Sequence, residues 1–159
     1  MDDNLRITYK NWLSTKLFDD GVNITFTVKQ LVNGIGIDKL KLEKNFRYFR
    51  NMLNKKIFGN RFKRFGVELK MLVVREVSSL QRLHLHTIIQ LPSHLSYDKF
   101  VYLIRLCWSK TLFGYGEIHI EKPSTQQREE GWFHYIMKKR SKIDFGDSID
   151  LENSTCLKN

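Results

Sequence analysis

Two histidines separated by a single residue are the part of this sequence best suited to chemistry. His84 and His86 lie in an otherwise apolar run that ends at Pro92. In an extended strand, residues i and i+2 point to the same face, so both imidazoles could hold one cation. Neutral histidine is the commonest metal ligand near neutral pH. Strand histidines are also often hydrogen-bonded structural residues, so the pair leaves both roles open.

A catalytic metal centre generally uses three protein ligands, and Glu76 is the best candidate for the third. If residues 78–82 form the loop of a hairpin, Glu76 lies directly opposite His84 on the neighbouring strand. A shift of the pairing by one residue would turn Glu76 to the other face, so this prediction depends on the register. Mixed nitrogen and oxygen ligands would suit Mg²⁺ or Mn²⁺.

A tyrosine and a lysine three residues apart form the second candidate group. Tyr135 and Lys138 lie in a predicted helix at 126–142, where residues three apart share a face. A nearby ammonium group favours the phenolate and neutralises a phosphate, and both effects help a tyrosine to attack a phosphodiester. The alternative is a core tyrosine followed by a basic helix end that complements the helix dipole.

The periodicity of the apolar residues predicts the elements that would position these side chains. In chain order they are a strand at 23–31, a helix at 38–58, strands at 67–77 and 83–91, a helix that begins after Ser96, a strand at 117–120 and the helix at 126–142. This order predicts the α+β class, with a split βαβ (ferredoxin- or RRM-like) antiparallel sheet and helices packed on it. We expect one domain over residues 1–143 and a loosely packed, polar and acidic tail over 144–159.

The charge of the chain favours a polyanionic partner. Lysine and arginine together number 27 against 17 acidic residues, which gives a formal net charge of +10. Nucleic acid is the first candidate partner and an anionic membrane surface is the second. Because no apolar stretch approaches the roughly 20 residues of a membrane span, and the N-terminus is acidic, we expect a cytosolic protein. Cys107 and Cys156 are far apart, so they indicate neither a disulfide framework nor a zinc knuckle.

Basic residues gather between the first predicted helix and the second predicted strand. They are Lys55, Lys56, Arg61, Lys63 and Arg64. Phenylalanines at positions 58, 62 and 65 lie among them, and this combination would allow DNA binding through phosphate neutralisation and base stacking. Core phenylalanines beside a solubilising loop are the alternative. Lys139 and Arg140 would extend the DNA-binding track beyond the second candidate group.

Three motifs occur in a characteristic order: Ile-Thr-Phe-Thr-Val at 24–28, His84-Leu85-His86, and Tyr-Ile-Met-Lys at 135–138. They resemble the FTLT-type strand, the histidine-hydrophobic-histidine motif and the YxxK motif of the HUH superfamily. This superfamily contains the rolling-circle replication initiators, or Rep proteins, of small plasmids, phages and viruses. The resemblance covers roughly residues 22–142. Lys139 stands where two-tyrosine members carry their second tyrosine, so the single-tyrosine type is the closer match.

The resemblance implies a metal-dependent DNA nicking-joining endonuclease. His84, His86 and Glu76 would hold a divalent metal, Mn²⁺ or Mg²⁺, although the third ligand varies across the superfamily. Tyr135 would attack the scissile phosphate, which Lys138 would help to position. The products would be a 5′-phosphotyrosine intermediate and a free 3′ hydroxyl that primes replication, and the reverse reaction would rejoin the strands without a nucleotide cofactor.

The resemblance also implies partners and a location. The substrate would be single-stranded DNA at a replication origin, in the cytoplasm of the host cell of a plasmid, phage or virus. A host helicase and polymerase and a homodimer stay open as further partners, and no membrane is implied.

Three other interpretations share some of these features. A non-catalytic module that binds single-stranded nucleic acid would use the same fold, with Phe26 as a stacking platform, although the central strand offers histidines where such modules use aromatics. An HUH transposase would share every predicted site residue. A two-histidine phosphoesterase is disfavoured, because its second HxT or HxS motif is missing and His119-Ile120-Glu121 does not fit that pattern.

Overall fold

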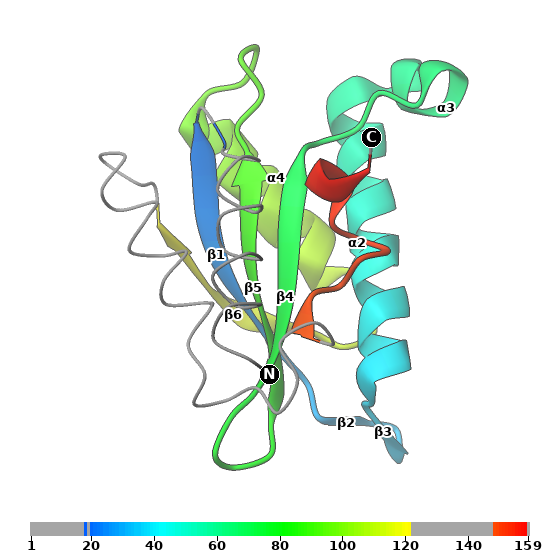
Figure 1. Cartoon of the computed structure of the whole chain (residues 1–159), viewed down its shortest axis with the longest axis vertical. Coiled ribbons are helices and arrows are strands. Elements are labelled where there is room, and N and C mark those ends of the chain that lie inside the picture. The colour runs from blue at the N-terminus through cyan, green and yellow to red at the C-terminus, as the bar shows by residue number, and fades with distance from the viewer. Residues whose placement is uncertain (1–17, 19, 122–147, 159) are drawn as a thin grey trace, which may run out of the picture.

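A computed structural model of the chain describes residue 18 and residues 20–121 and 148–158. Four strands form one antiparallel sheet with the order β4-β5-β1-β6, and helices pack on it, which confirms the predicted α+β class (Figure 1). The strands are β1 (Gly21–Val28), β4 (Met71–Val77), β5 (Leu83–Gln90) and β6 (Gly114–Glu121). The other elements are α2 (Lys39–Phe58), α3 (Asn60–Phe65), α4 (Tyr97–Ser109), the short strands β2 (Leu31–Val32) and β3 (Ile35–Gly36), and a 3₁₀ helix, η2 (Thr155–Leu157).

The topology of the sheet is the expected split βαβ arrangement. Strand β5 lies between β1 and β4 and pairs antiparallel with both. Strands β1 and β4 therefore run parallel to each other, and α2 connects them across the inserted strand. The predicted helix at 126–142 lies outside the described residues.

The two long helices begin where the sequence predicts. The side chain of Asp38 accepts a hydrogen bond from the backbone N–H of Lys41 at 2.8 Å, and α2 ends at Gly59, which has a φ of 56°. Hydrogen bonds from the side chain and backbone of Lys41 lower the pKa of the Asp38 carboxyl. In the same way, the Ser96 hydroxyl accepts the N–H of Lys99 at the start of α4.

The first predicted strand is shorter than expected. Strand β1 ends at Val28, and the chain then forms the small β2-β3 hairpin. Its turn residues, Asn33 and Gly34, have φ angles of 50° and 77°. Two consecutive left-handed residues are what a two-residue type I′ hairpin requires, and Asn-Gly is its favoured sequence.

The main core lies between the sheet and helices α2 and α4. The Phe26 ring of β1 is at its centre, with ring centroids 5.5, 5.1 and 4.6 Å from those of Phe46, Phe49 and Trp108. Ile24 and Val28, two residues away from Phe26 on β1, are buried in the same core. Because side chains alternate along a strand, the odd-numbered residues of β1 lie on the opposite face of the sheet.

The C-terminal segment packs against β4, so the prediction of a loosely packed tail was wrong for residues 148–158. Ile149 forms an isolated antiparallel bridge with Val74 and is buried. The N–H of Asp150 donates to the carbonyl of Val73 at 2.9 Å. This part of the chain therefore covers the outer edge of β4, on the side where β4 pairs with none of the described strands.

Side-chain hydroxyls complete the covering of that edge. The Ser154 hydroxyl accepts the N–H of Val73 at 3.0 Å, and the Thr155 hydroxyl accepts the N–H of Met71 at 2.9 Å. Ser154 is fully buried, so these bonds satisfy backbone groups that would otherwise be buried without partners.

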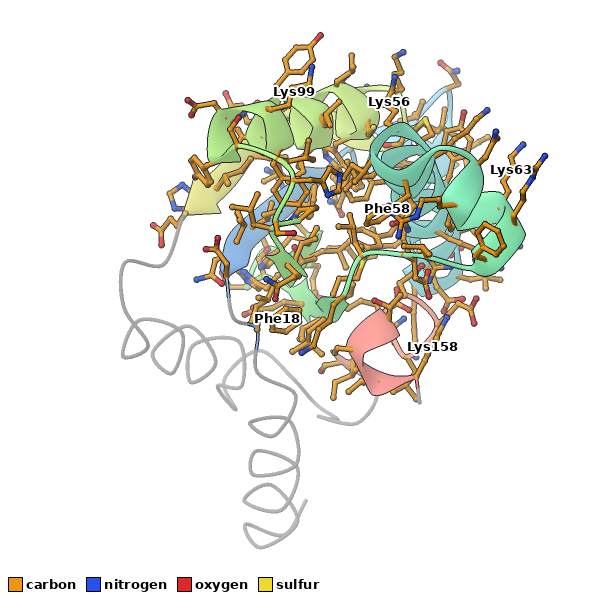
Figure 2. All side chains as sticks on the ribbon, turned by 90° about the horizontal axis from the view of Figure 1, so that it is seen from above. Phe18, Lys56, Phe58, Lys63, Lys99 and Lys158 are labelled. Atoms are coloured by element: carbon orange, nitrogen blue, oxygen red, sulfur yellow. The ribbon has the colours of Figure 1, made fainter. Side chains whose placement is uncertain are left out.

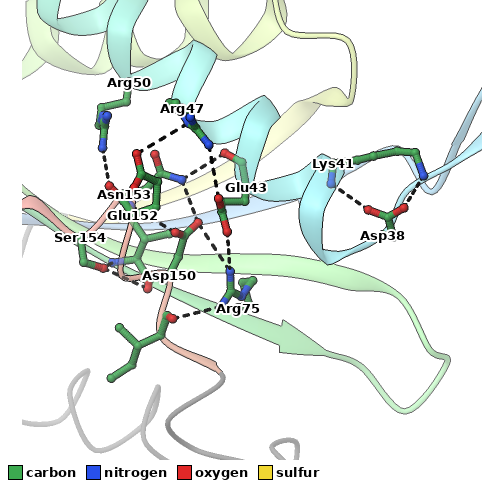
Figure 3. Close-up of polar contacts among 12 residues, drawn as sticks. Asp38, Lys41, Glu43, Arg47, Arg50, Arg75, Asp150, Glu152, Asn153 and Ser154 are labelled. Carbon is green, nitrogen blue, oxygen red and sulfur yellow. Dashed lines mark hydrogen bonds and ion pairs between the residues drawn. The ribbon is translucent and has the colours of Figure 1, made fainter.

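Arg75 ties the same segment to α2 (Figure 3). Its buried guanidinium donates to the carbonyl of Ile149 at 3.0 Å and forms ion pairs with Glu43 at 3.6 Å and Asp150 at 3.9 Å. Asn153 donates to the carbonyl of Glu43 at 3.1 Å. Buried charges are tolerated when they are paired and hydrogen-bonded, and Arg75 has both kinds of contact. These contacts also join the sheet, α2 and the C-terminal segment.

Candidate metal centre

The hairpin of β4 and β5 brings the three predicted ligands together. Residues 78–82 form its loop, which is closed by a hydrogen bond from the N–H of Ser78 to the carbonyl of Arg82 at 2.9 Å. Glu76 pairs with His84 in the register of the two strands, as predicted. Because His86 follows His84 by two residues, both imidazoles share one face of the sheet with the Glu76 carboxylate.

The three side chains are close enough to bind one ion. The Glu76 Oε2 atom lies 2.8 Å from His86 Nε2 and 3.7 Å from His84 Nε2, and one potential ligand atom from each residue lies within 4.8 Å of the others. Ligands at right angles around an ion at about 2.1 Å are about 3.0 Å apart. Small side-chain rotations would therefore bring the group to coordination geometry, so it could bind a metal ion.

The other ring nitrogen of each histidine faces a protein oxygen. His86 Nδ1 lies 3.1 Å from the hydroxyl of Thr25 on β1, and His84 Nδ1 lies 3.4 Å from the carbonyl of Arg82. A metal-ligating histidine usually donates its second N–H to such an acceptor, which fixes the ring and the tautomer. With hydrogen on Nδ1, both rings would present the lone pair of Nε2 toward Glu76.

The site lies partly below the protein surface, on the sheet face opposite α2 and α4. The side chains of His86, Glu76 and His84 are 3%, 17% and 20% exposed. The apolar residues Val74 and Ile88, which are buried in a second cluster, lie on the same face. Burial of a carboxylate beside apolar groups is costly without a partner. The two histidines, or a cation that all three share, supply that partner.

The predicted nucleophile is not among the residues that the structure describes. Tyr135, Lys138, Lys139 and Arg140 all fall within 122–147. Their positions relative to the histidines are therefore not part of the described geometry.

The basic cluster is at the other end of β4 from the metal ligands. Lys55 and Lys56 end α2, and Arg61, Lys63 and Arg64 lie on α3, which precedes β4. From the first residue of β4 to Glu76 the strand extends about 17 Å, at about 3.4 Å per residue. The structure therefore does not bring this cluster to the candidate metal centre.

The phenylalanines within this cluster differ in burial, so one suits the core interpretation and another suits base stacking. Phe58 packs against the main core, whereas Phe65 is 75% exposed. Figure 2 places Lys56 and Lys63 on the outside of the molecule, around the more interior Phe58. Helix α3 buries none of its residues, and it ends at Gly66 in the left-handed conformation. Its exposed ring and cations are therefore available to a partner.

Thr25 is a site residue that sequence reasoning missed. It pairs with His86 in the register of β1 and β5, but the two residues are 61 positions apart. The alternation of residues 23–31 already placed Thr25 on the face opposite Phe26. Only the pairing of β1 with β5, which is a non-local contact, shows that this hydroxyl meets the His86 ring.

None of the described helices has both the length and the apolar character that a membrane span requires. Comparisons of the chain with models of protein families, with curated proteins and with solved structures found no match.

Proposed function

We propose that the chain is a metal-dependent DNA nicking-joining endonuclease of the single-tyrosine HUH type, a replication initiator that acts on single-stranded origin DNA. The observation that carries this proposal is the convergence of Glu76, His84 and His86, with both Nε2 atoms directed toward the carboxylate. The order of the three sequence motifs and the net charge of +10 support it.

The residues of the chain divide the chemistry between them. Glu76, His84 and His86 would hold Mn²⁺ or Mg²⁺, which when bound withdraws charge from the scissile phosphate. The phenolate oxygen of Tyr135 attacks the phosphorus, while the ammonium group of Lys138 stabilises the phenolate and the phosphate. The bond from phosphorus to the 3′ oxygen breaks, and that oxygen takes up a proton as a free 3′ hydroxyl. The 5′ phosphate remains on Tyr135, and the reverse attack by a 3′ hydroxyl rejoins the strands.

A covalent adduct is the decisive assay. With Mn²⁺ and single-stranded DNA that contains the origin next to its gene, the full chain should form a protein-DNA adduct that survives denaturing electrophoresis. Tyr135→Phe should abolish the adduct and retain DNA binding, because it removes only the attacking oxygen. Tyr102→Phe is the matched control, since Tyr102 is exposed on α4. An adduct that persists in Tyr135→Phe would overturn the assignment of this tyrosine.

The metal centre needs its own variants. His84→Ala combined with His86→Ala should remove both Mn²⁺ binding, measured by calorimetry, and adduct formation, while the circular dichroism spectrum stays native. His94→Ala, at an exposed position between β5 and α4, should change neither. Unfolding of the double variant would instead return the two histidines to a structural role.

The burial of Phe26 counts against the alternative, a non-catalytic module that would use this ring to stack on a base. Phe26 is fully buried in the main core, against Phe46, Phe49 and Trp108, so its ring is not available to stack on a base. DNA that binds but remains uncut with every candidate origin would still favour that module. An HUH transposase would use the same residues and would differ in its DNA substrate.

A further inference from the structure

A groove lies beside the candidate metal centre, at the end of the sheet where β1 ends and β5 begins. It has a volume of about 610 Å³, and His84 is part of its wall. The side chains that could contact a ligand there include Lys29, Arg82 and Tyr115. Because His84 belongs both to this wall and to the three-residue group, the groove adjoins the metal centre.

An irregularity in the edge strand β6 forms one side of the groove. Phe26 pairs with Ile118, but Val28 pairs with Gly114, so the one residue between them on β1, Thr27, faces three residues on β6. Such bulges are common beside active sites, where they redirect side chains. The Thr27 hydroxyl donates to the carbonyl of Glu117 and thereby holds the bulge in place.

Gly114 fixes the start of the bulged segment. A Cβ atom at this position would lie 2.0 Å from the carbonyl oxygen of Trp108 at the end of α4, so only glycine permits this close approach. The beginning of β6 therefore packs closely against the backbone of α4. Tyr115, the next residue, is 48% exposed and lines the groove.

The floor of the groove is held by hydrogen bonds from Gln30. Its side-chain NH₂ group donates to the carbonyls of Val28 and Leu83, both at 2.9 Å, and its Oε1 accepts the N–H of Leu83 at 3.0 Å. The amide thus joins the end of β1 to the start of β5. A floor held in this way is preformed, which reduces the entropic cost of binding a ligand.

The exposed side chains around this floor suit a nucleotide. Lys29 and Arg82 are exposed, and neither forms an ion pair with an acid among the described residues. An exposed aromatic ring next to cations is the arrangement that binds single strands, since every base offers a face for stacking and every linkage carries a charge. Glu117, which also lines the groove, is an acceptor for the exocyclic amino group of a base.

We propose that this groove is a nucleotide subsite, in which Tyr115 stacks on a base next to the scissile phosphate while Lys29 and Arg82 contact the flanking phosphates. This inference rests on the proposed nuclease function, because the phosphate at the metal centre is what places a neighbouring nucleotide in the groove. Tyr115 is then a positioning residue for the strand and takes no part in the attack.

The test compares matched tyrosines in binding and in cleavage. Stacking on one base contributes about 1–3 kcal/mol, so Tyr115→Ala should weaken binding of a fluorescent single-stranded origin oligonucleotide by about 5- to 150-fold, measured by anisotropy with Mn²⁺ in a Tyr135→Phe background that does not cut the strand. Tyr115→Phe should retain the affinity, because it keeps the ring. Tyr102→Ala, on α4 at the other face of the sheet, should change the affinity less than twofold.

A second variant and a crosslink locate the contact. Arg82→Ala should lower the slope of log K against log salt by about 0.7, the value for one phosphate contact on a single strand. Its control is Arg105→Ala on α4, which should leave the slope unchanged. Ultraviolet crosslinking of a halogenated oligonucleotide should yield a labelled peptide that contains Tyr115.

The outcomes separate this proposal from the function on which it rests. Native affinity in Tyr115→Ala, together with an intact adduct through Tyr135, would overturn the subsite and leave the nuclease standing. Binding by the native chain that never leads to an adduct would overturn the nuclease. If the oligonucleotide does not bind to the native chain at all, both proposals fail.

Discussion

The substitution Glu76→Gln removes the charge at the candidate metal centre, and it preserves the size of the side chain and one of its two acceptor oxygens. The native chain should be stabilised when Mn²⁺ binds to the folded state. At a Mn²⁺ concentration of about 100 times the Kd, this stabilisation is about 2.7 kcal/mol. For a chain of this length, 1 kcal/mol raises the Tm by about 2–4 °C, so we expect a rise of about 5–11 °C.

The geometry sets how much of this rise the variant should lose. Glu76 Oε2 approaches both imidazoles, at 2.8 Å from His86 Nε2 and 3.7 Å from His84 Nε2. Loss of a group that only orients a ligand weakens metal binding by about 10- to 100-fold, so we take about 100-fold for the ligand itself. The same Mn²⁺ concentration then equals the Kd of the variant. The stabilisation falls to RT ln 2, about 0.4 kcal/mol, and the rise in Tm falls to about 1–2 °C.

The assay is thermal unfolding of each protein in EDTA and in Mn²⁺, with the rise in Tm compared rather than the Tm itself. Glu121→Gln is the matched control, since this exposed carboxylate contacts His119 at 2.7 Å on the same face of the sheet. It should leave the rise unchanged. If Glu76→Gln shows the full native rise, Glu76 is not a ligand and the argument from strand register is refuted.

Three further changes test other parts of the structure. Thr25→Val keeps the β-branched shape but removes the hydroxyl beside His86. The Mn²⁺ affinity measured by calorimetry should fall by about 10- to 100-fold, while the Tm in EDTA changes little. An unchanged affinity would mean that Thr25 does not orient the ring. Ser154→Ala leaves the buried N–H of Val73 without its acceptor, so the free energy of unfolding measured with urea should fall by about 1–3 kcal/mol, and a loss near zero would contradict the capping of β4. Lys63→Glu should weaken binding of single-stranded DNA at low salt and leave the rise in Tm with Mn²⁺ unchanged, whereas equal loss of both would contradict the separation of α3 from the metal centre.

The sequence predicted the parts of the site that depend on local structure. A hairpin with a five-residue loop fixes which residues face each other, so the pairing of Glu76 with His84 followed from the positions of the two strands. The start of each long helix could also be predicted from the sequence, because Asp38 and Ser96 are capping residues whose effect is confined to the first turn.

Contacts between distant parts of the chain could not be predicted in the same way. The segment 148–158 has no apolar periodicity of its own, since its role is to satisfy the edge of β4 through the hydroxyls of Ser154 and Thr155. Hydrophobic periodicity detects elements that pack by one face, and it does not detect an irregular segment that is held by hydrogen bonds and by a few buried side chains such as Ile149 and Cys156. The bulge at Tyr115 could not be predicted for a related reason, because it exists only in the pairing of β6 with β1.

The register that places Glu76 beside the histidines is fixed by more than the hairpin loop. Strand β5 also pairs with β1, and its residues Leu85 and Ile89 are buried in the main core. A shift of one residue would turn His84 and His86 into that core and move Leu85 and Ile89 to the opposite face. Each buried polar group without a partner costs about 2–7 kcal/mol. Because domains have a net stability of only about 5–15 kcal/mol, the shifted sheet would not be stable. Packing of the core on one face therefore determines the geometry of the metal ligands on the other.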